Sequence, residues 1–292
     1  MSRPDRLPAQ LPRQLVERAV AAALEEDLGL AGDLTSQATL TVAAQATASL
    51  SAREPGIIAG LDLAAAAFRL VGDGVVFTPR VGDGDSIGIG GVVATVSGPA
   101  RLVMSAERVA LNFLNHLSGI ATLTRTYADA VAGTGAQICD TRKTTPGLRA
   151  FEKYAVRCGG GANHRYALDD AILIKDNHIA VAGSVTAAYR AAEAFAGHLV
   201  AIEIEVQTLA ELEEALAAGA RIVLLDNMDN QTLRQAVAIN AGRARLEASG
   251  GVRLDRVHSI AETGVDYIST SQITMAAQPL DLGLDVEIDG QP

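Results

Sequence analysis

Short apolar runs recur along the second half of the chain, and each run ends in a polar residue. The runs are AQICD, AILIKD, VAIEIEV, RIVLLDN, RLEASGG and VDYIST. An apolar run of this kind is typical of a strand that is buried on both faces of a parallel sheet. Segments with helical spacing separate the runs, for example residues 208–220 and 254–264. Strands that alternate with helices predict a parallel α/β architecture.

The polar residues at the predicted strand ends favour a β/α barrel over an open sheet. Lys175, Glu205, Asp226, Ser249 and Ser269 follow one another, by subtraction, at intervals of 30, 21, 23 and 20 residues. Each interval suits one strand with its helix. Since the reacting groups of a β/α barrel lie at the C-terminal ends of its strands, we expect these side chains to face one shared mouth.

The first part of the chain has a different pattern of apolar and polar residues. Residues 14–28 have the spacing of an amphipathic helix, and residues 41–103 contain short β-like runs broken by glycines. Residues 105–131 contain no proline and predict a long helix, with a break expected near Gly119. The sequence therefore predicts a small α+β domain that precedes the barrel.

Composition limits the class of partner. The chain has 292 residues and a net charge of -10, and it has no long basic run, so we expect no binding to nucleic acid. Apolar stretches such as residues 63–68 are too short to cross a bilayer, and the first residues lack the apolar core of a secretory signal. We therefore expect a cytoplasmic protein in which Cys139 and Cys158 are buried thiols.

Residues 140–178 form a local cationic window. They contain seven Lys or Arg and five acids, a balance of 7 - 5 = +2, in a chain that is acidic overall. Such a window suits a ligand with several carboxylates or phosphates, which arginine grips bidentately. A solvated loop with charges of both signs is the alternative.

Two further groups of residues suit a phosphate ester and its metal ion. Glu205 and Asp226 at neighbouring strand ends could hold Mg2+ directly or through water, or each could cap a helix. Glu203 faces the same way as Glu205, so position alone does not decide which acid is the ligand. The segment 249–251, SGG, lies between a strand and a helix and could bind phosphate through its backbone N–H groups.

The segments DTRKTTPGLRAFEKYAVRCGGGANHR and ILIKDNHI resemble the signature of the quinolinate phosphoribosyltransferase family. ERVALNFLNHLSGIAT, IEIEV, LLDN, EASGG and GVDYIS extend the resemblance over most of the chain after residue 100. The resemblance implies an α/β fold, with an incomplete β/α barrel at residues 113–279 and an N-terminal α+β open sandwich at residues 1–112. The tail at residues 280–292 is expected to return to the N-terminal domain.

The same resemblance implies an enzyme that makes nicotinate mononucleotide from quinolinate and phosphoribosyl pyrophosphate, with Mg2+ as cofactor. It implies a homodimer with sites shared between subunits, and a hexamer is left open. The residues implied to bind quinolinate are Arg108 (from the partner subunit), Thr141, Arg142, His164, Arg165 and Lys175. Those implied to serve phosphoribosyl pyrophosphate are Lys143, Glu205, Asp226, Ser249, Gly250, Gly251, Thr270, Ser271 and Gln272. Lys143, Glu205 and Asp226 are the implied catalytic residues, and Glu205 and Asp226 the implied metal ligands.

Two positions depart from the pattern of the family. Ser271 stands where the family usually has glycine, and Met275 replaces a histidine, so the phosphate role of residues 270–272 is the weakest part of the assignment. Two other functions stay open. One is phosphoribosyl transfer to a related aromatic acid, and the other is a non-catalytic barrel that binds anions.

Overall fold

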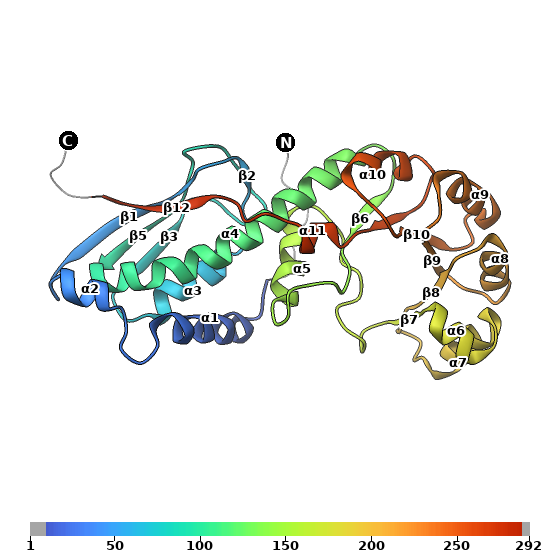
Figure 1. The fold of residues 1–292 in the computed structure, drawn as a ribbon, viewed down its shortest axis with the longest axis horizontal. Coiled ribbons are helices and arrows are strands. Elements are labelled where there is room, and N and C mark those ends of the chain that lie inside the picture. The colour runs from blue at the N-terminus through green and yellow to red at the C-terminus, as the bar shows by residue number, and fades with distance from the viewer. Residues whose placement is uncertain (1–9, 288–292) are drawn as a thin grey trace. The chain divides into compact units, whose positions relative to one another are not determined.

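A curved parallel sheet of six strands organises the second half of the chain (Figure 1). The structure is a computed structural model and describes residues 10–287. All six predicted apolar runs form strands, and the strands lie side by side in the order β6-β11-β10-β9-β8-β7. Their bounds are β6 Gln137–Cys139, β7 Ile172–Ile174, β8 Ile202–Val206, β9 Ile222–Asp226, β10 Arg245–Ser249 and β11 Tyr267–Ser269.

This sheet is an incomplete β/α barrel. β6 and β7 are the two ends of the order, and within residues 10–287 they do not pair with each other. Figure 1 shows α8, α9 and α10 on the outer side of the curve. Ile204, Val223 and Leu246 are buried in the sheet. The helices of this part are α6 Asp176–Ala182, α7 Val185–Phe195, α8 Leu209–Ala217, α9 Asn230–Asn240, α10 Leu254–Ala261 and α11 Gln272–Met275.

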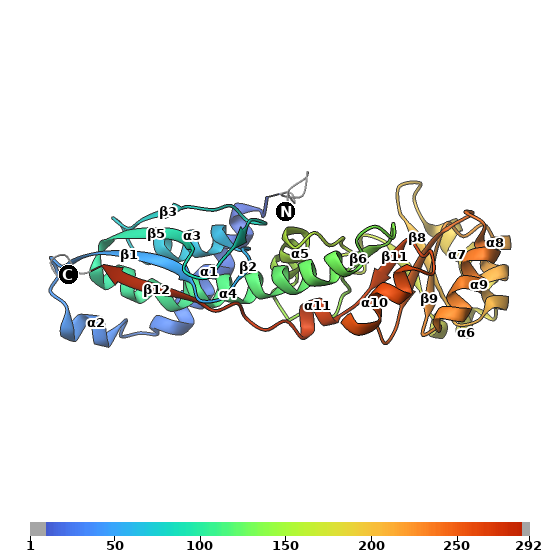
Figure 2. The ribbon, with the colours of Figure 1, turned by 90° about the horizontal axis from the view of Figure 1, so that it is seen from above.

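The N-terminal part is built on an antiparallel sheet in the order β12-β1-β5-β3. The C-terminal segment forms β12, which pairs with β1 and lies beside it in Figure 2; residues 288–292 lie outside the described residues. The predicted fold class, an incomplete barrel with an α+β open sandwich, is confirmed. The elements are α1 Arg13–Leu28, α2 Leu34–Thr39, β1 Gln45–Ala52, β2 Gly56–Ile57, α3 Leu61–Leu70, β3 Val76–Pro79, β4 Ser86–Ile87, β5 Val92–Pro99, α4 Ala100–Ala130, α5 Arg149–Cys158 and β12 Leu282–Glu287.

The long helix α4 is continuous, so the predicted break near Gly119 was wrong. Gly119 is a close-approach position instead, because a Cβ atom there would lie 2.1 Å from the carbonyl oxygen of Gln278. A glycine in a helix therefore marks contact with another backbone here, not the end of the helix. Within residues 10–287 no helix, α4 included, combines the length and apolar character that crossing a bilayer requires.

The chain divides into two units at places that differ from the expected boundary at residues 112 and 113. The first unit holds the described residues up to Arg125, residues 150–160 and residues from 277 onward. The second holds residues 126–149 and 161–276. The helix α5 belongs to the first unit because it packs on α4: the rings of Phe113 and Phe151 meet edge to face at 6.4 Å. Nothing in the local sequence marks this packing.

Candidate active site

One pocket of about 1020 Å³ lies at the C-terminal ends of the parallel strands. This is the end of a β/α barrel at which catalytic groups are found. Every predicted site residue except Arg108 lines the pocket; Arg108 lies on α4 in the first unit, with an exposed side chain. The predicted residues in the pocket are Thr141, Arg142, Lys143, His164, Arg165, Lys175, Glu205, Asp226, Ser249, Gly250, Gly251, Thr270, Ser271 and Gln272.

Arg142 and Arg165 line this pocket, and each has one guanidinium nitrogen that makes no hydrogen bond within residues 10–287. The Nε atoms of Arg142 and Arg165 are buried and have no hydrogen-bond partner among residues 10–287. Burial, and then the positive charge of Arg142, lower the pKa of Arg165. Two neighbouring cations are unfavourable on their own, and an anion bound between them would offset their repulsion.

The buried side chain of Asp140 fixes the loop that carries His164 and Arg165. Its Oδ1 accepts the backbone N–H of His164 at 2.8 Å, and its Oδ2 accepts the side-chain amide of Asn163 at 2.6 Å. The other end of the loop is tied down by Arg165, whose guanidinium donates to the carbonyl of Ala171 at 3.1 Å. Asp140 directly follows β6, so the strand end itself sets the position of the loop.

His164, Glu203 and Glu247 form a compact group, of which His164 and Glu247 line the pocket. The Nε2 atom of His164 is 2.9 Å from Glu203 Oε2 and 3.8 Å from Glu247 Oε1. Their ligand atoms all lie within 4.8 Å of one another, a spacing that a metal ion could also use. The 2.9 Å contact joins an imidazole nitrogen to a carboxylate oxygen, a pairing that a hydrogen bond also explains. We therefore describe the group as hydrogen-bonded.

The two predicted metal ligands have different surroundings. Glu205 is buried at the end of β8, and its Oε2 pairs with the ammonium of Lys175 at 2.7 Å. Asp226 ends β9, is half-buried, and accepts the side-chain amide of Asn227 at 2.8 Å. The alternation of the strand places Glu203 and Glu205 on the same face and does not distinguish them. The structure does, because Glu203 contacts His164 and Glu205 contacts Lys175.

The side chain of Lys143 is exposed, and its backbone N–H and carbonyl are both hydrogen-bonded. Its N–H donates to the hydroxyl of Thr141 at 3.0 Å, and its carbonyl accepts the hydroxyl of Thr274 at 2.8 Å. Met275, beside Thr274, is largely exposed and does not line the pocket. The threonine of the Thr274–Met275 pair therefore supports the site, and we assign Met275 no role.

Residues 250 and 251 adopt backbone conformations that favour glycine. Both have positive φ angles, 93° and 59°. A Cβ atom on Gly250 would lie 2.2 Å from Oδ1 of Asn227, a residue that itself has a positive φ of 55°. This close approach exposes backbone at the pocket wall, as a phosphate-binding turn requires.

Sequence reasoning missed Glu247 and Asn227 as site residues. Glu247 was detectable, because two-residue alternation places it on the same face of β10 as Ser249. Asn227 follows Asp226 directly, but its contact with Gly250 depends on the backbone of two different loops. No local signal in the sequence carries that contact.

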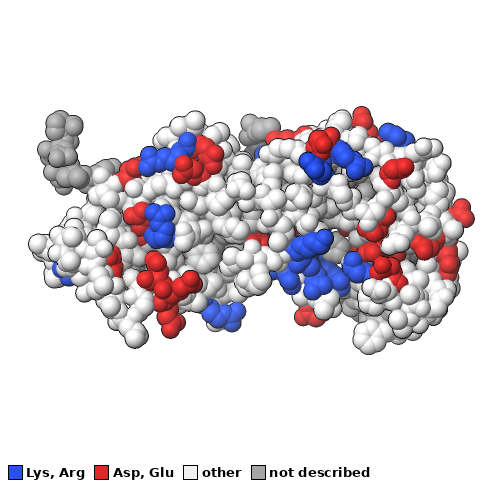
Figure 3. Space-filling view, in the orientation of Figure 1, with Lys and Arg blue, Asp and Glu red and all other residues white. Residues whose placement is uncertain are grey.

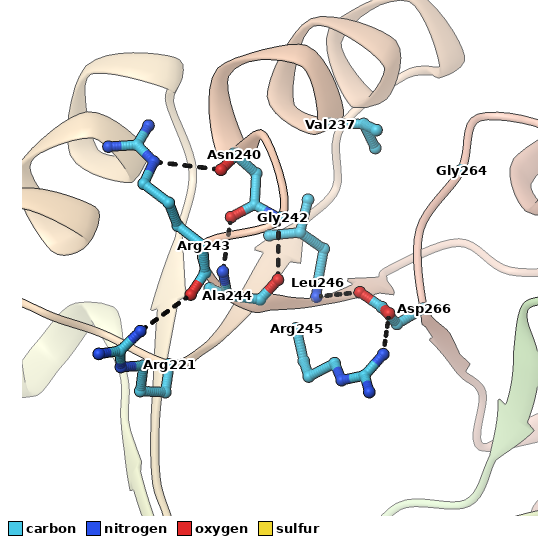
Figure 4. A pocket seen from close by; sticks show the side chains of 10 residues that line it. All are labelled: Arg221, Val237, Asn240, Gly242, Arg243, Ala244, Arg245, Leu246, Gly264 and Asp266. Carbon is cyan, nitrogen blue, oxygen red and sulfur yellow. Dashed lines mark hydrogen bonds and ion pairs between the residues drawn. The ribbon is translucent and has the colours of Figure 1, made fainter.

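A second pocket, of about 540 Å³, lies at the opposite ends of the strands (Figure 4). It contains three arginines, but their guanidinium groups bond to neighbouring protein groups. Arg245 pairs with Asp266 at 2.6 Å, and Arg243 donates to the carbonyl of Asn240 at 3.1 Å. Arg221 donates to the carbonyl of Arg243 at 3.5 Å. These contacts tie strand starts to a helix end, so this pocket is structural.

Fold and pocket together define a β/α-barrel enzyme for a small substrate with several negative charges. Figure 3 shows Lys and Arg side chains gathered beside a group of Asp and Glu on one face of the molecule. Cations suit the carboxylates or phosphates of a substrate, and acids suit a metal ion or a developing positive charge. Phosphoribosyl transfer to an aromatic acid needs both.

Comparison with known proteins identifies the family. The N-terminal domain of quinolinate phosphoribosyl transferase matches residues 33–118, and its C-terminal domain matches residues 120–285. The chain is 46% identical to the carboxylating nicotinate-nucleotide pyrophosphorylase of Mycobacterium leprae, over 91% of this chain and 95% of that protein. It superposes on the crystal structure of NadC from Streptococcus pyogenes with a TM-score of 0.92 and 42% identity, over 96% of this chain and 100% of that one. The chain belongs to the quinolinate phosphoribosyltransferase family.

Proposed function

We propose that this protein transfers the phosphoribosyl group of phosphoribosyl pyrophosphate to quinolinate and removes one carboxylate. The products are nicotinate mononucleotide, pyrophosphate and CO2, a step of NAD biosynthesis. The observation that carries this proposal is the pair Arg142 and Arg165, two neighbouring cations that line one pocket. A pyridine with two adjacent carboxylates supplies the negative charges that such a pair binds.

Quinolinate binding is assigned to the cationic side of the pocket. Arg142 and Arg165 take the carboxylates, while Thr141 and Lys175 line the same wall. Lys175 is now paired with Glu205 at 2.7 Å, so a substrate carboxylate would compete with Glu205 for the ammonium. Substrate binding would therefore leave the carboxylate of Glu205 without its ammonium partner. Its negative charge could then stabilise the positive charge that develops on the sugar during transfer.

The acidic side of the pocket fits Mg2+ and phosphoribosyl pyrophosphate. Glu205 and Asp226 offer the hard oxygen ligands that Mg2+ takes, directly or through water. Bound there, Mg2+ would neutralise the charge of the leaving pyrophosphate. Lys143 lies on the same pocket and would bind the pyrophosphate as well, with the turn at residues 249–251 and residues 270–272 near phosphate.

The residues of the chain act by charge and position in this mechanism. The pyridine nitrogen attacks C1 of the ribose as pyrophosphate leaves, and the carboxylate of Glu205 stabilises the positive charge that develops on the sugar. Alkylation makes the ring nitrogen cationic, so the adjacent carboxylate can leave as CO2 while the ring stabilises the electron pair. The arginines hold the two carboxylates in place for both steps.

A direct assay tests the function. The purified protein, given quinolinate, phosphoribosyl pyrophosphate and Mg2+, is expected to form nicotinate mononucleotide and to release CO2 in equal amounts. Chelation of the metal is expected to abolish turnover, and added Mg2+ to restore it. Nicotinate or orotate in place of quinolinate should give no product. Turnover of those acids, or no product from quinolinate, would refute the proposal.

The active assembly in this proposal is a homodimer in which Arg108 completes the site of the partner subunit. Support comes from the exposure of its side chain, because 64% of the Arg108 side chain on α4 is exposed. A cation displayed to solvent in this way is available to another subunit.

Subunit mixing tests the shared site. Chains with Arg108→Ala and chains with Lys143→Ala are each expected to be inactive. Mixed dimers would contain one intact site, so full subunit exchange is expected to restore roughly a quarter of the wild-type activity. The same mixture without exchange is the control. Activity that stays at the level of the separate variants after exchange would rule out a shared site.

We also propose that the protein works in the cytoplasm. Cys139 and Cys158 are buried and form no disulfide. Burial raises the pKa of the Cys158 thiol far above its ordinary range, so this thiol stays protonated and unreactive. Buried thiols of this kind fit a reducing compartment.

A further inference from the structure

The reaction proposed above needs a proton that none of the assigned residues supplies. When the carboxylate on ring carbon C2 leaves as CO2, the bonding electron pair stays on C2, and a proton must form the new C–H bond. Four acids line the pocket: Asp176, Glu205, Asp226 and Glu247. Of the first three, Asp176 is exposed, Glu205 is paired with the ammonium of Lys175, and Asp226 is half-buried.

Glu247 differs from the other three acids. Its side chain is buried, with only 5% of the residue exposed, although it belongs to the pocket lining. Its Oε1 atom has no hydrogen-bond partner within residues 10–287. A buried carboxylate with an unused oxygen is costly, whereas a carboxylic acid at the same place is not. Geometry therefore favours the protonated form.

The neighbouring imidazole does not offer a compensating positive charge. The backbone N–H of Arg165 donates to Nδ1 of His164 at 2.8 Å, so Nδ1 carries a lone pair. The proton of the ring is then on Nε2, which donates to Glu203 at 2.9 Å. His164 is thus a neutral imidazole, and both of its nitrogens bond to protein groups. It positions Arg165 and Glu203, and it leaves Glu247 with its proton.

The charges around Glu247 agree with this arrangement. Burial first, and then the negative charge of Glu203, raise the pKa of Glu247 to about 7. This value already includes the lowering contributed by a charge on His164 and by the hydrogen bond with Ser269, and a smaller raising contribution from Asp140. A general acid works best with a pKa near the working pH, where it both holds and releases a proton.

We infer that Glu247 is the acid that protonates C2 after decarboxylation. The bond between C2 and the carboxylate carbon breaks and CO2 leaves. The electron pair on C2 takes the proton of the Glu247 carboxyl group, which becomes a carboxylate and is reprotonated from water after product release. His164 lies 3.8 Å from Glu247 and accepts the backbone N–H of Arg165, so one residue links the acid to the arginine assigned to a substrate carboxylate. This inference rests on the proposed function.

The variant Glu247→Gln separates the two chemical steps. Gln keeps the shape of the side chain but has no transferable proton. We expect the first-turnover release of pyrophosphate to stay within about twofold of wild type, while formation of nicotinate mononucleotide falls about 100-fold or more. N-ribosylated quinolinate should accumulate, and Glu247→Asp should recover part of the rate. Glu213→Gln, an exposed acid on α8, is the matched control and should leave both rates unchanged.

The wild-type protein gives an independent measurement that does not depend on the folding of a variant. Glu247 must be protonated to act, so the rate constant for nicotinate mononucleotide formation is expected to fall as the pH rises through about 7. This alkaline decrease should be absent from the residual activity of Glu247→Gln.

Three results would overturn the inference. They are a wild-type rate of nicotinate mononucleotide formation in Glu247→Gln, an equal loss of both steps with a raised KM, and a wild-type rate that does not fall above pH 7. Failure of the proposed function is a different result, because wild type would then release neither pyrophosphate nor CO2 from quinolinate.

Discussion

Replacing Arg142 or Arg165 with alanine is expected to raise the KM for quinolinate about 100-fold, equivalent to about 2.7 kcal/mol of binding free energy. Each guanidinium lines the pocket, so each can give a charged hydrogen bond to a substrate carboxylate. The KM for phosphoribosyl pyrophosphate should change far less, because the acids and the glycine turn that suit it are untouched. Steady-state kinetics with each substrate varied in turn measure both effects.

The stability of Arg142→Ala is expected to hold or to increase slightly, whereas Arg165→Ala also loses the hydrogen bond to the carbonyl of Ala171 and is expected to lose about 1 kcal/mol. Arg142 and Arg165 repel each other, and the repulsion contributes to the lowered pKa of Arg165. Removing one cation relieves that repulsion, so loss of binding would not reflect loss of folding. Arg234→Ala, an exposed arginine on α9, serves as the control and should leave KM unchanged. Wild-type kinetics in both pocket variants would remove the arginine pair from substrate binding.

Lys143→Ala is expected to lower kcat/KM for phosphoribosyl pyrophosphate about 1000-fold, since it removes a preorganised cation from the charge that develops on the leaving group. The backbone of Lys143 is held by Thr141 and Thr274, and its side chain is exposed, so the fold should not change. The melting temperature is therefore expected to match that of wild type.

Lys143→Arg preserves the charge and distinguishes charge from geometry. A compact ammonium and a planar guanidinium place their donors differently, so we expect partial recovery, about 10- to 100-fold above Lys143→Ala. Equal activity in wild type and Lys143→Ala, at saturating and subsaturating phosphoribosyl pyrophosphate, would exclude Lys143 from the transfer step.

The apolar runs in the sequence were sufficient to predict the barrel strands. All six runs became strands because a short, largely apolar segment is stabilised by burial in a parallel sheet that is covered on both faces. The clustering of Lys175, Glu205 and Asp226 followed from the same pattern, since parallel strands bring all their C-terminal ends to one edge. The repeat along the chain therefore predicted the pocket as well as the sheet.

The continuity of α4 and the assignment of α5 could not be predicted in this way. Gly119 is a poor helix former, and local propensity favours a break there. The backbone near Gln278 needs that space, and the packing outweighs the propensity. The helix α5 lies between two barrel strands in sequence, but Phe151 packs against Phe113 of α4, a contact across 38 residues (151 - 113).

The sequence alone determined which residues gather at the mouth of the barrel, because strand direction and alternation are local properties of the chain. Only the tertiary structure decided how those residues pair. It matched Glu203 with His164 and Glu205 with Lys175, and it left Glu247 buried with one oxygen that no group of residues 10–287 bonds. The reason is distance: hydrogen bonds and ion pairs depend on separations of about 3 Å. Separations that small are set by loops and strand register together, which no segment of the sequence encodes by itself.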